Sequence, residues 1–136
     1  VPDPDDYLNF DQGWNRGTLA WETGTGASAL IHGLEASLEL LKTFGTQKIA
    51  NYLEDLTGYL CGRLEEKNYE IVSSRAPGEK SQIVCIRHPR RLSVTALYAQ
   101  LKAQNIITAP RGDRLRIAPH VYNTLEEIDQ FVAALP

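Results

Sequence analysis

One arginine near the C-terminus stands on a short apolar run, a setting suited to binding a carboxylate. Residues 115–124 read Leu-Arg-Ile-Ala-Pro-His-Val-Tyr-Asn-Thr, so Arg116 lies on a predicted strand that Pro119 ends. A planar guanidinium makes two parallel hydrogen bonds to a carboxylate, and a rigid strand would fix its orientation. Arg114 lies two residues earlier and would share a face of that strand. The spacing alone therefore does not select between the two arginines.

A second candidate site lies in the segment Trp-Glu-Thr-Gly-Thr at residues 21–25. Glycine lets a backbone approach a phosphate closely, and a threonine hydroxyl can donate a hydrogen bond to it. Gly24 and Thr25 are therefore candidate phosphate ligands. An ordinary turn and helix start before Ala27 explains the same residues, and sequence chemistry alone favours that interpretation.

The histidines and cysteines indicate neither a metal site nor a nucleophile. His32, His88 and His120 are scattered, and no spacing of Cys and His residues fits zinc. Cys61 falls in a helical pattern and Cys85 in an apolar strand pattern, which is typical of reduced core thiols in a cytoplasmic protein. We therefore expect a cytoplasmic chain without a metal.

Composition is that of one globular domain, with 136 residues, 43% of them apolar and 23% charged. The formal net charge is −3, and the densest basic stretch, residues 87–91, sits at a turn. This argues against a nucleic-acid partner. No apolar run approaches the ~20 residues that span a bilayer, so no membrane partner is expected. The absence of methionine suggests a piece of a longer chain.

Hydrophobic periodicity and turn residues predict the element order α-α-β-β-α-β-β-α, preceded by an irregular arm over residues 1–26. Trp14 and Trp21 in that arm either pack on a partner or fold back on the arm's own domain. We expect residues 27–136 to form an α+β domain of two layers, with helices packed on a small, mainly antiparallel sheet. The expected elements cover residues 27–44, 46–68, 69–72, 82–87, 94–102, 105–109, 114–118 and 125–135.

Local signals place the ends of several elements. Ser93 is expected to cap the third helix, and Thr124 with Glu127 forms a predicted capping box for the last one. Residues 110–113 are expected to form the turn between the last two strands. The inward-facing positions predicted for the last two helices are Val94, Leu97, Tyr98, Leu101, Ile128, Phe131 and Val132.

Four segments, taken in order, resemble the C-terminal small domain of class V aminotransferases. This family of fold-type-I pyridoxal-phosphate (PLP) enzymes includes cysteine desulfurases, kynureninases and isopenicillin-N-epimerase-like proteins. The resemblance covers nearly the whole chain, including a Glu-x-Gly-Thr element at 22–25 and an Arg-x-x-x-x-x-Tyr-Asn ending at 116–123. The other two segments are a helix with small residues at Gly33, Ala36 and Ser37, and the strand at 81–89.

The resemblance implies roles for the candidate residues. Arg116 would hold the carboxylate of an amino-acid substrate. Gly24 and Thr25 would touch the PLP phosphate of the neighbouring subunit, which implies a homodimer. The chain departs from many relatives at Gly26 and Ala27, where they have Pro-Asn.

The resemblance also implies what this chain lacks. In the family, a large N-terminal domain supplies the lysine that binds PLP covalently, and none of the five lysines here has the expected setting. We therefore expect the isolated chain to be inactive. Residues 108–113 contain no cysteine where desulfurases carry their nucleophile, which favours a transaminase- or epimerase-like enzyme. The alternative is a stand-alone, non-catalytic α+β binding or scaffold domain.

Overall fold

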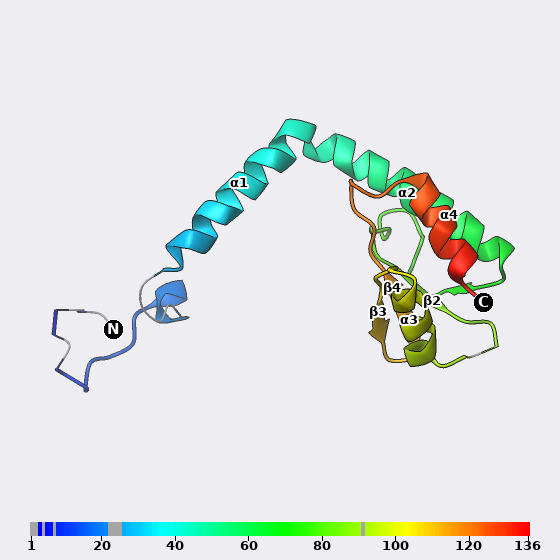
Figure 1. Cartoon of the computed structure of the whole chain (residues 1–136). Helices are drawn as coiled ribbons and strands as arrows, with labels where there is room; N and C mark the ends of the chain where they lie inside the picture. The colour runs from blue at the N-terminus through cyan, green and yellow to red at the C-terminus, as the bar shows by residue number, and fades with distance from the viewer. Residues whose placement is uncertain (1–2, 4, 7, 22–25, 91) are drawn as a thin grey trace. The chain divides into compact units, whose positions relative to one another are not determined.

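The helices and strands follow the predicted order along the chain (Figure 1). The computed structural model describes residues 3, 5–6, 8–21, 26–90 and 92–136. Over these residues the elements are a 3-10 helix η1 (Gly17–Trp21), α1 (Ser28–Phe44), α2 (Thr46–Glu66), β1 (Glu70–Ile71), β2 (Val84–Arg87), α3 (Val94–Ala103), β3 (Ala109–Arg111), β4 (Arg114–Ile117) and α4 (Leu125–Ala134).

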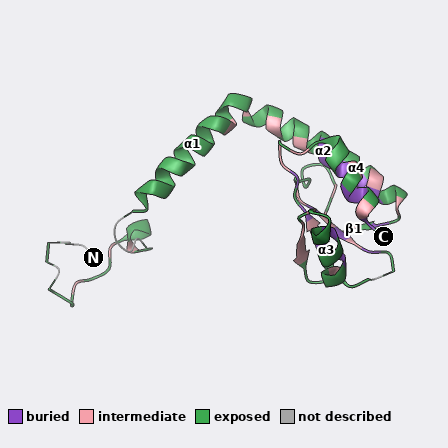
Figure 2. Ribbon diagram, in the orientation of Figure 1, coloured by how far each residue is buried: buried purple, intermediate pink, exposed green. Residues whose placement is uncertain are grey.

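The chain divides into two compact units, Val1–Leu40 and Leu41–Pro136. In the first unit, η1 and α1 are coloured almost entirely as exposed (Figure 2). The exposed large apolar residues here include Trp14 in the segment before η1, Trp21 at the end of η1, and Leu30, Ile31, Leu34 and Leu38 on α1. The leucine spacing thus predicts the helix correctly, but its apolar face stays uncovered. Among the described helices, none combines the length and apolar character needed to cross a membrane.

In the second unit, a four-stranded sheet has the order β1-β2-β4-β3, and every neighbouring pair is antiparallel. Side chains alternate between the two faces of each strand. Leu115 and Ile117 of β4 are buried on one face, as are Val84 and Ile86 of β2. The intervening residues lie on the opposite face and are not buried. The α+β, mainly antiparallel architecture is thus confirmed.

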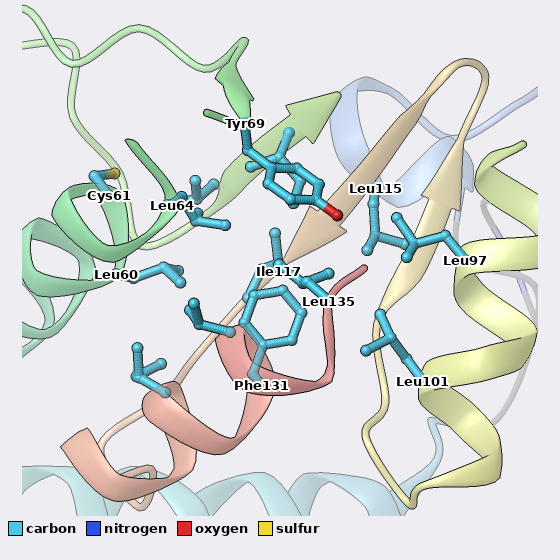
Figure 3. Close-up of a cluster of buried hydrophobic side chains, with 14 of the residues drawn as sticks. Leu60, Cys61, Leu64, Tyr69, Leu97, Leu101, Leu115, Ile117, Phe131 and Leu135 are labelled. Carbon is cyan, nitrogen blue, oxygen red and sulfur yellow. The ribbon is translucent and has the colours of Figure 1, made fainter. Parts of the chain in front are cut away.

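The hydrophobic core fills the space between the buried face of the sheet and α2, α3 and α4 (Figure 3). On α2, Leu56, Leu60 and Leu64 recur every four residues and are at most 1% exposed. The inward positions Leu97, Leu101, Ile128, Phe131 and Val132 are buried as predicted, whereas Val94 and Tyr98 are partly buried. The core helices α2, α3 and α4 therefore lie on one side of the sheet and do not cover its other face.

The third strand differs from its predicted position. The apolar run 105–109 was expected to form it, but β3 begins at Ala109. Asn105 has a positive φ of 60°, and the N–H of Ile106 donates to the carbonyl of Leu101, so this segment ends α3. The turn is also shorter than predicted, because Gly112 has a φ of 58° at the first position of a two-residue hairpin loop.

The connection from β4 to α4 agrees with the sequence signal. The Thr124 hydroxyl accepts a hydrogen bond from the backbone N–H of Glu127, and the Glu127 carboxylate accepts one from the backbone N–H of Thr124. This reciprocal pair satisfies donors that the first turn of a helix otherwise leaves unpaired. The start of α4 is therefore fixed immediately after the strand that carries Arg116.

Tyr69 makes the stability of this unit sensitive to alkaline pH. Its ring is 4% exposed, its hydroxyl donates to the carbonyl of Pro136 at 3.2 Å, and burial raises its pKa from 10.0 to about 12. Between these two pH values the unfolded chain loses the tyrosine proton while the folded chain keeps it. The contribution of Tyr69 to the free energy of unfolding is fully present below pH 10 and is lost as the pH rises toward 12.

We expect Tyr69→Phe to be less stable than the wild type at neutral pH and to lose less stability between pH 10 and 12. Urea unfolding across this range measures the difference. Tyr122→Phe, at a ring that is 76% exposed, is the matched control. Parallel stability curves for the wild type and Tyr69→Phe would contradict this account.

Candidate functional site

Arg116 lies within β4, on the face of the sheet that α2, α3 and α4 leave uncovered. Its direct cross-strand neighbours are Cys85 on β2 and Ala109 on β3. The side chain is half-buried, and its Nε is buried without a hydrogen-bond partner among the described residues. A buried donor without a partner is unfavourable by about 1–3 kcal/mol, so an acceptor that reached this Nε would be stabilising. Arg116 therefore remains the candidate for binding a carboxylate.

A second arginine on the same face, Arg87 on β2, is already paired. Its Nη1 lies 2.6 Å from a carboxylate oxygen of Glu70, and its Nε lies 2.8 Å from Asp113. The hydrogen bond from Arg87 holds the pKa of Asp113 below its usual value of 3.8, and the two carboxylates raise the pKa of Arg87. These ion pairs connect β1 and β2 to the loop between β3 and β4.

The sequence placed Arg87 at the end of a predicted strand and the start of a basic turn, but it indicated neither of its partners. The partners lie 17 and 26 positions away in the chain. Only the strand register brings them together. The alternation of side chains along the predicted strands could have placed Arg87 on the same face as Arg116. It could not have shown that Arg87 lies beside Glu70 and Asp113, because that depends on the register.

The hairpin adds two further arginines that sequence reasoning did not combine into a site. Arg111 at the end of β3 is directly opposite Arg114 at the start of β4. Arg114 and Arg116 flank the buried Leu115, so they share the uncovered face, as the spacing predicted. The sequence Arg-Gly-Asp-Arg at 111–114 is compatible with a two-residue turn flanked by arginines, but the predicted turn at 110–113 placed Arg111 inside the turn.

The Tyr-Asn-Thr segment after β4 fixes the backbone rather than contributing to the arginine face. The side-chain oxygen of Asn123 accepts from the N–H of His120 at 2.9 Å, and its amide donates to Glu127 at 3.0 Å. The hydroxyl of Tyr52 on α2 donates to the Asn123 carbonyl at 2.6 Å. These bonds hold the end of β4 against α2 and α4, so they position the strand on which Arg116 lies.

The remaining candidates take no part in this arrangement. Gly24 and Thr25 lie outside the described residues. His88 is buried, accepts a hydrogen bond from the N–H of Arg90, and has a pKa lowered mainly by burial, so it is a structural residue. His32 is exposed beside Glu35. Over the described part of the chain, no group of His, Cys, Asp and Glu side chains could hold a metal.

Two hollows in the second unit do not include Arg116. One of about 210 Å³ lies between the segment 105–108 and α4, and one of about 440 Å³ lies beside the first half of α2. His120 lines the larger hollow, and its Nδ1 is buried without a partner among the described residues. Because neither hollow contains a cluster of charged groups like that on the open sheet face, we place the candidate site on that face.

Comparisons with known proteins agree with the sequence motifs. The family model for class V aminotransferases matches residues 7–131. A curated protein of Bacillus subtilis strain 168, named uncharacterized aminotransferase YcbU, is 29% identical over 119 residues. The match covers 88% of this chain and 31% of that protein.

Two solved structures share the fold. One is the apo structure of a cysteine desulfurase from Thermococcus onnurineus NA1, with a TM-score of 0.78 and 20% identity, covering 88% of this chain and 33% of that one. The other is a NifS-like protein, with a TM-score of 0.71 and 19% identity, covering 88% and 36%. The chain thus spans about a third of each of these relatives. Since the family model matches most of its length, the chain belongs to the class V aminotransferase family.

Proposed function

We propose that this chain is the small C-terminal domain of a PLP-dependent enzyme that acts on an amino acid, with Arg116 binding the substrate carboxylate. The observation that carries the proposal is the buried Nε of Arg116, which has no hydrogen-bond partner among the described residues and belongs to a strand position facing away from α2, α3 and α4. Family membership supports it, because the Arg-x-x-x-x-x-Tyr-Asn ending falls within the matched residues. PLP, when bound, acts as an electron sink for bonds broken at the substrate Cα.

The roles of this chain are binding and orientation. Arg116 would hold the carboxylate in one plane through its guanidinium fork, and the Asn123 hydrogen bonds would keep the strand end in place. Gly24 and Thr25 would contact the PLP phosphate across a homodimer. A missing N-terminal large domain would supply the lysine that binds PLP, in a cytoplasmic enzyme.

The positions of the lysines in this chain support the proposal that the PLP-binding lysine belongs to the other domain. Lys67 donates to the carbonyl of Leu135 at 2.7 Å, and Lys80 pairs with Glu54 at 3.0 Å. Lys42 lies in the last turn of α1, and Lys102 lies in the last turn of α3. Lys48 lies in the first turn of α2. None of the contacts described for these lysines involves Arg116, and we propose that the chain alone is inactive.

Within the family, we propose a transaminase- or epimerase-like enzyme rather than a cysteine desulfurase. Residues 108–113 contain no cysteine and end in a tight two-residue hairpin loop. Cys61 is buried in α2, and burial raises the pKa of its thiol, which lowers its reactivity. Cys85 lies within β2, opposite Arg116. The cysteine desulfurase among the solved structures is 20% identical to this chain, a likeness that supports a shared fold alone.

The test is a spectrum of the full-length protein, purified without added cofactor, before and after borohydride reduction. We expect a near-visible absorption band, and after reduction a pyridoxyl group on one lysine outside these 136 residues. The 136-residue chain alone, treated in the same way, is the control and should carry no modified lysine. Absence of the band even after PLP is added would refute the proposal and favour a non-catalytic binding domain.

A further inference from the structure

The β3–β4 hairpin places two like charges directly opposite each other, which is unfavourable in an antiparallel pair. Arg111 and Arg114 are register partners on either side of the Gly112–Asp113 loop, and both side chains are exposed. The Cβ atoms of directly opposite residues are about 5 Å apart, and like charges on such a pair are destabilising. A negative charge beside this pair would therefore stabilise it.

The described residues do not supply enough of that charge. Asp113 is held by Arg87 at 2.8 Å, while its other oxygen lies 3.5 Å from Nε of Arg114. Within the described part of the chain, Arg111 donates to the neutral carbonyl of Pro110, at 2.8 Å. With Arg87 and Arg116, the described residues of this face include four arginines against the two carboxylates of Glu70 and Asp113, in a chain whose formal net charge is −3.

The excess positive charge lies beside the carboxylate-binding position. Arg114 and Arg116 are two residues apart on one strand, a rise of roughly 6.6 Å, and their side chains project from the same face. Arg111 extends this row across the hairpin. A ligand whose carboxylate is held by Arg116 can therefore present a second anionic group to Arg114 and Arg111.

We propose that Arg111 and Arg114 form a second anion subsite that selects an amino-acid substrate with an acidic side chain. The proposal rests on the function proposed above, in which Arg116 binds the other carboxylate. A neutral amide of the same shape would leave both guanidinium groups without a counter-charge. Since hydrogen bonds to charged groups are stronger than neutral ones, we expect a preference of roughly 10- to 100-fold for the acid over its amide.

The experiment compares kcat/KM of the full-length, PLP-loaded protein for aspartate and glutamate with that for asparagine and glutamine. Arg114→Gln and Arg111→Gln should lower the values for the acids by about tenfold each and leave the values for the amides nearly unchanged. In parallel, calorimetry measures binding of non-reacting glutarate and butyrate. Glutarate should bind more tightly to the wild type, and Arg114→Gln should remove that advantage.

Two further variants separate the possible failures. Arg116→Gln should weaken binding of acids and amides alike, and Lys102→Gln, on a helix packed against the other face of the sheet, should change neither. Equal wild-type values for acids and amides would overturn the subsite. So would hairpin variants that lower the unfolding temperature without changing selectivity, because the arginines would then pair with another part of the protein. If the full-length protein binds no cofactor, the proposed function fails. The comparison of glutarate with butyrate binding would still show whether Arg114 and Arg111 bind a second anionic group.

Discussion

Replacing Arg116 with glutamine should lower kcat/KM of the full-length protein by about 100-fold and leave its fold intact. The guanidinium fork can make two charge-assisted hydrogen bonds to a carboxylate, and losing them removes about 3 kcal/mol of binding free energy, which corresponds to ~100-fold. Within the described residues the Nε of Arg116 has no partner to lose. We therefore expect the free energy of unfolding to change by no more than about 1 kcal/mol.

Steady-state kinetics and urea unfolding measure the two quantities on the same protein. Arg116→Lys keeps the charge but not the fork, so its kcat/KM should lie between those of the wild type and Arg116→Gln. Arg90→Gln, at an exposed arginine in the turn after β2, is the control for removing a positive charge elsewhere. Full activity in Arg116→Gln would show that another group holds the carboxylate.

The fold was largely predictable because its signals are local. Leucine spacing defines α2, Ser93 accepts from the N–H of Ala96 to cap α3, and Thr124 with Glu127 caps α4. The position of β3 was not predictable from apolar residues alone. There the positive φ of Asn105 and of Gly112 decides where α3 ends and where the hairpin turns.

The candidate site was predictable only in part, since it depends on register. A strand pattern and a family motif pointed to Arg116, but the pairing of Arg87 with Glu70 and Asp113 joins residues far apart in the chain. Those pairings appear only once the order β1-β2-β4-β3 is known. The row of arginines on the open face is thus a property of the sheet and not of any one sequence segment.

Hydrophobic periodicity shows which face of a helix is apolar but does not identify what covers it. Leu60 on α2 and Leu34 on α1 both belong to regular apolar stripes. Leu60 is 0% exposed in the core, while Leu34 is 57% exposed. The same Leu→Ala substitution should therefore change the free energy of unfolding much more at Leu60 than at Leu34.

Leu60→Ala should lower the free energy of unfolding of the 136-residue chain by about 2–5 kcal/mol, because a fully buried leucine leaves a cavity that its neighbours fill only partly. Typical domains have about 5–15 kcal/mol in total, so this is a large fraction of the stability. Leu34→Ala is the matched control and should change it by about 0.5 kcal/mol or less. Urea unfolding of both variants measures the difference.

The same pair also tests whether a partner covers α1. If the proposed large domain packs on the exposed leucines, Leu34→Ala should be nearly neutral in the 136-residue chain but destabilise the full-length protein by about 1–3 kcal/mol, the range for burying a leucine side chain. Leu60→Ala should have a similar effect in both, since its neighbours all lie within the second unit. A neutral Leu34→Ala in the full-length protein would show that this face of α1 remains in contact with solvent.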